Sequence, residues 1–302
     1  MKNLEFPPSL KQKDKVLIIS PSGKIDKMLL KGMKVRLTEW GLKVIQGKYS
    51  AAKAGLFAGT TKQRLADLQY GLDHKEIKAI FCSRGGYGAI QLLDKISLEK
   101  FKIHPKWIIG YSDITSLHCL LQKRGFASIH APMARHFTME AKDDLSLELL
   151  NRILRGESMH YIVKGHKYNK KGSAQGILRG GNLAVLQSLR NTSYDFIPDN
   201  TILYLEDVNE SPNTVQRMFY NLKMSGVLSR LSGLILGQFT QNYTNKDICE
   251  DVYQAIHTLL KEFSYPICYN FPIGHVTRNY PLINGAYAKF VVNKNTSELN
   301  FG

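Results

Sequence analysis

The chain has 302 residues, of which 43% are hydrophobic and 22% charged, a composition typical of a soluble globular protein with room for two domains. Its formal net charge of +16 is compatible with nucleic-acid binding. However, the lysines are spread along the chain, and no helix-turn-helix, zinc-finger or aromatic RNA-binding signature accompanies them. We therefore expect a solvated basic surface that attracts acidic ligands, and no nucleic-acid partner.

The cysteines and the N-terminus indicate the compartment. No pair of cysteines has C-x-x-C spacing, so the sequence supports neither a zinc ribbon nor a redox motif. The first eight residues lack the apolar core of a signal peptide, and no stretch approaches the length of a membrane span. These features predict a cytoplasmic protein with free, mostly buried thiols and no membrane partner.

The first half of the chain alternates apolar strands with helical patterns. Strands are predicted at 15–20, 42–45, 79–82, 107–111 and 127–129, and helices at 27–40 and 61–72. Such alternation indicates a parallel sheet covered on both faces. Because ligands bind beyond the carboxyl ends of parallel strands, the segments after these strands are candidate site residues.

A glycine-rich segment, Ser83-Arg84-Gly85-Gly86-Tyr87-Gly88, follows one of these strands. It has neither a G-x-G-x-x-G register nor a Gly-Lys-Ser/Thr sequence, which argues against a phosphate-binding loop. Paired glycines let backbone N–H groups approach a ligand closely. Two interpretations stay open: a loop that donates an N–H group to an oxyanion, and a tight strand-to-helix turn.

The stretch 107–118 passes from an apolar strand through Gly110 to Ser112 and then into helical spacing. A serine at a sharp strand-to-helix turn has the geometry of a nucleophile elbow, and the helix N-terminus behind it favours a nearby oxyanion. Only Gly110 and Ser112 fit the Gly-x-Ser-x-Gly pattern, because Ile114 occupies the second glycine position. The alternative is that Ser112 caps the helix.

The sequence of the second half of the chain predicts a linker followed by a mixed β region. The segment 156–174 breaks the periodicity with glycines, lysines and histidines, and we interpret it as the linker between domains 1–155 and 175–302. Beyond it, extended segments are predicted at 176–178, 201–205, 233–236, 267–269, 286–292 and 298–301, and helices at 183–189, 212–224 and 247–263.

A base for Ser112 would come from one of nine histidines. His118 lies on the same predicted helix and points away from the elbow, whereas His130 at a strand end and His275 in a glycine-containing loop are candidates. An acid that orients this histidine should also lie at a strand end. Glu206 does, and Asp207 and Glu210 are alternatives. The other histidines considered, near or in the linker, are His136, His160 and His166.

Taken in order, these motifs resemble the LD-carboxypeptidase family of serine peptidases, which includes the microcin C immunity protein. The resemblance rests on Ile18-Ile19-Ser20-Pro21-Ser22, Arg84-Gly85-Gly86-Tyr87-Gly88, Ile109-Gly110-Tyr111-Ser112-Asp113, Gly180-Gly181-Asn182-Leu183, Leu205-Glu206-Asp207 and Gly274-His275. It implies an N-terminal Rossmann- or flavodoxin-like α/β nucleophile domain and a C-terminal β-rich α+β domain.

The resemblance also implies an activity. The family hydrolyses the amide between an L-centre diamino acid and a terminal D-alanine in murein tetrapeptides, without a metal or cofactor, and typically forms cytoplasmic homodimers. Its nucleophile falls on Ser112, its acid on Glu206 and its histidine on His275. Its oxyanion donors would be the backbone N–H groups of Gly86 and Asp113.

Arginines are the candidate residues for binding the substrate. An arginine is the natural partner of the substrate's free terminal carboxylate, and Arg84 and Arg278 are candidates. After the histidine the family often has a closely spaced Pro-x-Gly, whereas this chain has Tyr280-Pro281-Leu282-Ile283-Asn284-Gly285. A microcin-type peptidyl-nucleotide substrate and a non-catalytic nucleotide- or nucleic-acid-binding module are the alternative functions.

Overall fold

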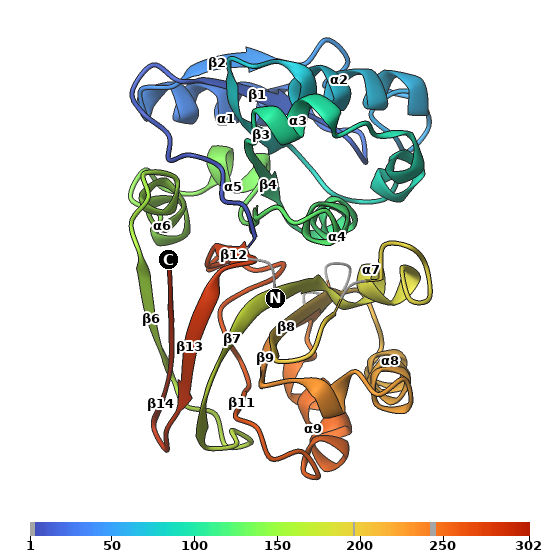
Figure 1. Cartoon of the computed structure of the whole chain (residues 1–302), viewed down its shortest axis with the longest axis vertical. Helices are drawn as coiled ribbons and strands as arrows, with labels where there is room; N and C mark the ends of the chain where they lie inside the picture. Colours follow the sequence, from blue (N-terminus) through green and yellow to red (C-terminus); the bar gives the residue numbers. More distant parts are fainter. Residues whose placement is uncertain (1–3, 196, 242–245) are drawn as a thin grey trace. The chain divides into compact units, whose positions relative to one another are not determined.

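The computed structural model describes residues 4–195, 197–241 and 246–302, which form two compact units (Figure 1). The first unit comprises Met1–Glu157 and Tyr280–Leu282, and the second comprises Ser158–Asn279 and Ile283–Gly302. The chain therefore returns briefly to the first unit near its end, which the sequence did not predict.

The first unit is built on the predicted parallel sheet. Its strand order is β12-β5-β4-β3-β1-β2, and all pairings among β1 to β5 are parallel. Without the edge strand β12 this is the flavodoxin-like order 2-1-3-4-5, which confirms the predicted fold class. The strands are β1 (Lys15–Ile19), β2 (Lys43–Gln46), β3 (Ile77–Cys82), β4 (Trp107–Gly110), β5 (Ser128–His130) and β12 (Leu282–Asn284).

Helices cover both faces of this sheet, since consecutive residues of β1, β3 and β4 are buried. α1 packs on α5, whereas α2 packs on α3 and on the 3-10 helix η1. Side chains set the helix starts: Asp26 caps α1, and Thr60 with Gln63 forms a capping box on α2. The helical segments are α1 (Lys27–Glu39), α2 (Thr61–Asp73), η1 (Ala89–Lys95), α3 (Glu99–Ile103), η2 (Ser112–Ile114), α4 (Thr115–Lys123), α5 (Ala134–Met139) and α6 (Leu145–Leu154).

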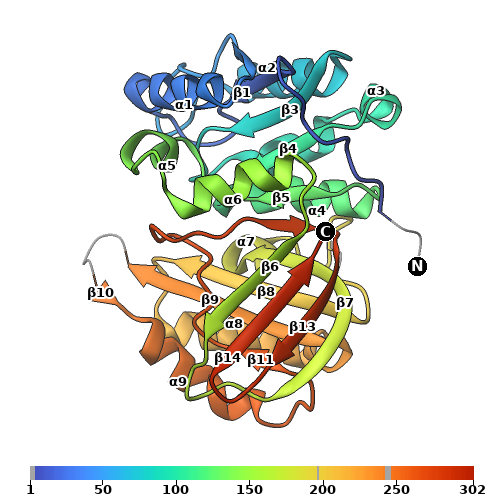
Figure 2. The ribbon, with the colours of Figure 1, turned by 90° about the vertical axis from the view of Figure 1, so that its left-hand side faces the viewer.

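The second unit has a mixed sheet of order β10-β9-β8-β7-β13-β14-β6, with β11 pairing β9 (Figure 2). Strands β7, β8, β9 and β11 are parallel to one another, and the connections between them contain the helices α7, α8 and α9. The remaining strand pairs are antiparallel. Its elements are β6 (Met159–Lys164), β7 (Gly172–Asn182), α7 (Leu183–Ser188), β8 (Thr201–Val208), α8 (Pro212–Met224), η3 (Leu228–Arg230), β9 (Gly233–Gln241), β10 (Lys246–Asp247), α9 (Cys249–Leu260), β11 (Ile267–Cys268), β13 (Tyr287–Val292) and β14 (Thr296–Phe301).

The structure corrects the prediction that segment 156–174 is a linker. Segment 156–174 contains the edge strand β6, which pairs antiparallel with β14, and the first residues of β7. Met159 and Tyr161 are buried, whereas His160 and Lys164 are exposed, so the segment alternates with the period of a strand. The flanking glycines and lysines hid this short alternation.

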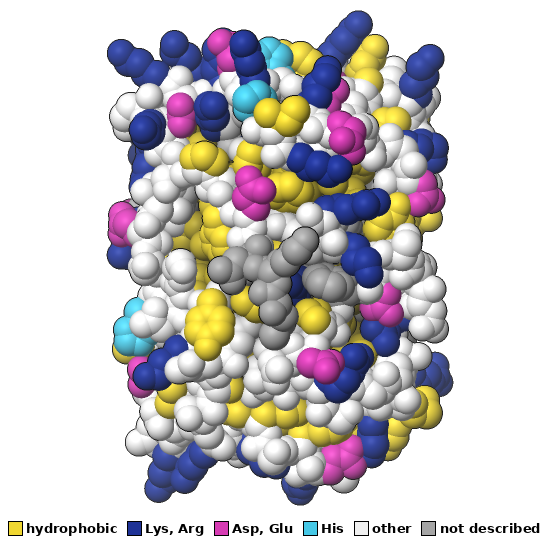
Figure 3. All heavy atoms as spheres, in the orientation of Figure 1, with side chains coloured by type: hydrophobic (Ala, Val, Ile, Leu, Met, Phe, Trp, Pro, Cys, Tyr) yellow, Lys and Arg dark blue, Asp and Glu magenta, His cyan; other side chains and the backbone are white. Residues whose placement is uncertain are grey.

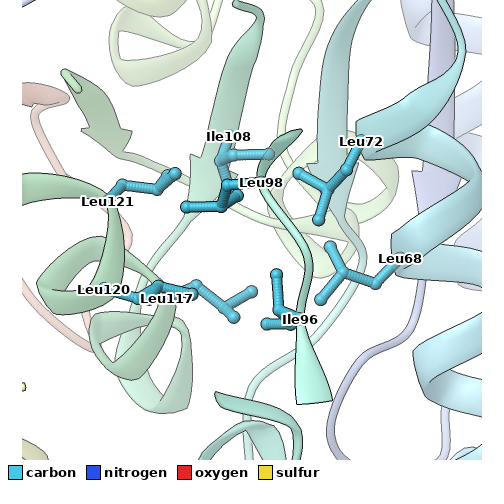
Figure 4. A pocket seen from close by; sticks show the side chains of 8 residues that line it. All are labelled: Leu68, Leu72, Ile96, Leu98, Ile108, Leu117, Leu120 and Leu121. Carbon is cyan, nitrogen blue, oxygen red and sulfur yellow. The ribbon is translucent and has the colours of Figure 1, made fainter. Parts of the chain in front are cut away.

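A small void lies beside α4 in the first unit (Figure 4). It measures about 10 Å³ and has only aliphatic neighbours. A void of this size with no polar partner cannot hold a bound water, so we assign it to core packing rather than to a site. Its lining residues are Leu68, Leu72, Ile96, Leu98, Ile108, Leu117, Leu120 and Leu121.

Candidate active site

Ser112 lies two residues after the end of β4, in a strained turn. Its φ is +63°, and apart from Lys13 the other non-glycine residues with positive φ among the described ones are asparagines. A serine in this region of φ costs free energy and occurs where the surrounding structure enforces it. The N-cap alternative is wrong, because Tyr111 occupies the N-cap of η2 and no side chain caps it. The geometry is that of an elbow.

The glycine-rich loop after β3 packs directly against this elbow. A Cβ atom on Gly85 would lie 2.8 Å from the Cβ of Ser112 and 3.2 Å from the backbone nitrogen of Asp113, so no side chain fits there. The next residue, Gly86, has a φ of +103°. The loop and the start of η2, from which the two oxyanion donors were predicted, are therefore neighbours.

Two buried charged side chains hold these segments, and no sequence pattern indicates the first of them. The guanidinium of Arg64, on α2, donates to the carbonyls of Pro21 at 2.7 Å and of Gly88 at 2.8 Å. The carboxylate of Asp113 accepts from the backbone of Ala89 at 2.8 Å. Burial lowers the pKa of Arg64 and raises the pKa of Asp113, which the Arg64 charge partly offsets. Arg64 therefore ties together the segments after β1 and β3.

His118 supports the strand that enters the elbow. It is fully buried; its Nε2–H donates to the carbonyl of Gly110 at 2.8 Å, and its Nδ1 accepts from the hydroxyl of Ser128 at 2.9 Å. Since a carbonyl only accepts, Nε2 carries the proton. Burial lowers the pKa of His118 to about 4. His118 is therefore a neutral structural residue rather than the base.

This burial predicts a pH effect on stability. The unfolded chain binds a proton on His118 near pH 6.5, whereas the folded chain does so only near pH 4. The free energy of unfolding should fall as the pH drops across this window, by up to about 3 kcal/mol. Urea unfolding of the wild type and His118→Gln from pH 4 to 7 checks this, because the variant should lack this part of the slope. Equal slopes would contradict the assignment.

The second unit contains a buried glutamate–histidine pair. The Nδ1–H of His275 donates to Oε2 of Glu206 at 2.8 Å, and Glu206 is fully buried. Glu206 was predicted to follow β8, but the strand continues to Val208. A carboxylate on Nδ1 orients the ring and leaves Nε2 as the acceptor, which is the arrangement a general base needs.

The backbone around His275 is fixed from both sides. β9 bulges opposite Glu206, and within this bulge the backbone nitrogen of Gln238 donates to the carbonyl of Ile273 at 2.9 Å. The side chain of Asn279 accepts from the nitrogen of Gly274 at 3.0 Å. Gly274 has a φ of +123°, and a Cβ there would lie 3.0 Å from Oε2 of Glu206. Gln238, in a strand, and Asn279, in a loop, were missed because an isolated polar residue carries no pattern.

The alternative acid Asp207 is engaged elsewhere. Its carboxylate accepts from the Nδ2 of Asn182 and from the backbone nitrogens of Ala184 and Val208, each at 2.8 Å. Burial and then the Glu206 charge raise the pKa of Asp207 to about 7. Asp207 therefore joins β8 to the start of α7.

The remaining candidates have other neighbours. His160 pairs with Glu298 at 3.2 Å on the outside of the sheet, and His130 is buried in β5. The guanidinium of Arg84 donates to the carbonyl of Lys24, so this arginine ties the glycine-rich loop to the segment after β1. Arg278 is exposed in the His275 loop. No three His, Cys, Asp or Glu side chains in the described part of the chain are grouped as metal ligands.

Similarity to known proteins decides the family. A model of the LD-carboxypeptidase N-terminal domain matches residues 16–131, and one of the C-terminal domain matches residues 175–290. The murein tetrapeptide carboxypeptidase of Pseudomonas aeruginosa is 30% identical over 275 residues, covering 88% of this chain and 89% of that protein. The chain belongs to the LD-carboxypeptidase family.

Solved structures agree with the fold. The muramoyltetrapeptide carboxypeptidase from Oxalobacter formigenes matches with a TM-score of 0.85 at 25% identity, over 95% of this chain and 98% of that one. An MccF-like protein from Bacillus anthracis matches with a TM-score of 0.86 at 23% identity, over 98% and 99% of the two chains. This second likeness concerns the fold alone. Among the described residues, no helix has the length and apolar character needed to cross a bilayer.

Proposed function

We propose that this LD-carboxypeptidase homologue is a serine carboxypeptidase that removes the terminal D-alanine from murein tetrapeptides. The observation that carries the proposal is the strained Ser112 turn, with Gly85 pressed against it. The buried Glu206–His275 pair supports it. The relatives named for murein and muramoyltetrapeptide carboxypeptidases supply the substrate class.

In the proposed mechanism, Nε2 of His275 removes the Ser112 proton as the hydroxyl attacks the carbonyl before D-alanine. Glu206 keeps the proton on Nδ1 and stabilises the imidazolium. The backbone N–H groups of Gly86 and Asp113 stabilise the tetrahedral oxyanion. His275 then protonates the departing amine, and water releases the acyl group.

Other parts of the proposal rest on family resemblance. Arg84 and Arg278 are the candidate partners of the substrate's terminal carboxylate. Of the two, the exposed Arg278 beside His275 is the less constrained, because the guanidinium of Arg84 already donates to the carbonyl of Lys24. A cytoplasmic homodimer without metal or cofactor completes the proposal.

A peptidyl-nucleotide substrate is the second candidate. One solved relative of the same fold is an MccF bound to glutamyl sulfamoyl guanosine. The binding-module alternative has less support, because basic side chains are scattered over the face in Figure 3 rather than gathered into one patch.

The test is to incubate the protein with a murein tetrapeptide and follow the loss of D-alanine by mass, with Ser112→Ala, His275→Ala and a chelator in parallel reactions. Chelator-resistant release that both variants abolish is the expected result. If the folded wild type releases nothing, a peptidyl-nucleotide takes the place of murein. Fluorophosphonate labelling that survives Ser112→Ala would contradict the assigned nucleophile, and salt-sensitive DNA binding would favour the binding module.

A further inference from the structure

Arg64 is a buried arginine whose side chain binds several segments of the first unit. It is 2% exposed. Its Nη1 donates to the carbonyls of Pro21 at 2.7 Å and Gly88 at 2.8 Å, and its Nη2 donates to Oε1 of Gln91 at 2.6 Å. The ring of Phe57 lies 4.9 Å from the guanidinium carbon. Because a buried charge is rarely the most stable choice for a core position, these contacts indicate a role beyond packing.

The contact with Gly88 fixes one end of the loop that carries the proposed oxyanion donor Gly86. The other end is fixed by Gly23, whose nitrogen donates to the carbonyl of Gly85 at 3.0 Å. Gly86 lies between these two contacts with a φ of +103°. Glycine adopts positive and negative φ about equally well, so the surrounding contacts select this conformation. The direction of the Gly86 N–H therefore depends on both ends of the loop.

One nitrogen of Arg64 bonds both segments that meet at this loop. Pro21, one acceptor of Nη1, lies two residues before Gly23 in the chain. Gly88, the other acceptor, lies so close that a Cβ atom on it would be 2.7 Å from Nη1. The position of the guanidinium therefore sets the spacing between the segment after β1 and the end of the loop.

We propose that Arg64 is a positioning residue that holds the Gly86 N–H where the oxyanion forms, and so raises kcat without contacting the substrate. The inference rests on the proposed serine mechanism. The second proposed donor is tied to the same end of the loop, because the carboxylate of Asp113 accepts from the nitrogen of Ala89 at 2.8 Å. Oxyanion donors stabilise the transition state more than the bound substrate, so their displacement should lower kcat and leave KM nearly unchanged.

The test compares Arg64→Met and Arg64→Lys in the full chain. Arg64→Met keeps the length of the side chain but removes its donors. It should lower kcat for D-alanine release by about 10²- to 10³-fold, as the loss of one oxyanion donor does, with KM within about threefold. Arg64→Lys keeps the charge without the planar fork of donors and should recover about tenfold of this loss. Fluorophosphonate labelling of Ser112 should slow in parallel, because phosphonylation also develops charge on an oxygen that these N–H groups bind.

Arg36→Met is the matched control. Arg36, on α1, is 9% exposed, and its guanidinium also donates to backbone carbonyls, those of residues 140–142, each at 3.1 Å. These carbonyls follow α5 and are not part of the glycine-rich loop. The replacement should lower the unfolding temperature as Arg64→Met does, yet leave kcat and the labelling rate within about threefold.

The outcomes separate positioning from a general effect on the fold. A loss of kcat below about tenfold in Arg64→Met, or an equal loss in Arg36→Met, overturns the positioning role. If Arg64→Met does not fold, Arg64→Lys decides: a loss of at least about fivefold in kcat at unchanged KM supports the role, and a smaller loss overturns it.

The labelling experiment separates this role from the proposed murein activity. If the wild type releases no D-alanine but is labelled at Ser112, the murein substrate fails and the labelling rates decide. Slower labelling in Arg64→Met than in Arg36→Met then supports the positioning role, and equal rates overturn it. A wild type that is neither active nor labelled overturns both proposals, since Arg64 would have no oxyanion donors to position.

Discussion

Ser112→Ala is expected to reduce kcat for D-alanine release by at least about 10⁴-fold, because no other group would attack the carbonyl. Removing the nucleophile of a serine peptidase typically costs about 10⁶-fold and leaves only the rate due to binding and oxyanion stabilisation. The turn should persist, since Gly85 leaves room for a Cβ atom at position 112 but not for one of its own. Release of D-alanine measured by mass at saturating peptide checks this.

Ser116→Ala is the matched control for this variant. Ser116 lies one helical turn further along in α4, is fully buried, and its hydroxyl has no hydrogen-bond partner among the described residues. Its replacement should leave kcat within about threefold, as expected of a substitution that removes no interaction. A Ser112→Ala variant that retains more than a tenth of the wild-type rate would contradict the nucleophile assignment.

The first unit could be predicted because its strands and helices carry clear periodic signals. The runs at 15–20 and 107–111 are almost wholly apolar, as buried parallel strands are, and the structure confirms both as β1 and β4. β12 could not be predicted in the same way. This three-residue strand near the C-terminus forms the edge of a sheet whose other strands lie more than 150 residues earlier in the chain. No local sequence pattern indicates such a pairing.

The residues of the candidate site also differ in whether the sequence indicates them. Ser112, Glu206 and His275 stand out in the sequence because each follows a strand or a glycine. Arg64 does not, because an arginine on an amphipathic helix resembles a surface residue until the carbonyls of Pro21 and Gly88 surround it. Residues that act only through distant backbone groups leave no trace in spacing or composition.

Glu206→Gln is expected to lower kcat by about 10³- to 10⁴-fold, with KM changed far less, as the acid-to-amide change does in trypsin. An amide nitrogen facing Nδ1 would favour the wrong tautomer of His275, and an amide oxygen there would still lack the charge that stabilises the imidazolium. Steady-state kinetics on the tetrapeptide measures this. Glu298→Gln is the matched control, since Glu298 forms a similar but exposed pair with His160. A loss below tenfold in Glu206→Gln would rule out Glu206 as the acid.

Thermal unfolding separates this loss from damage to the fold. Oε1 of Glu206 has no hydrogen-bond partner among the described residues, and the Glu206 charge contributes to raising the pKa of Asp207 to about 7. Ionisation of Asp207 therefore opposes folding as the pH rises through 7, and a neutral residue at 206 relieves part of this cost. Glu206→Gln should consequently unfold at pH 8 at a temperature no lower than the wild type. A stable variant with a collapsed kcat would mean that the buried carboxylate is kept for catalysis at the expense of stability.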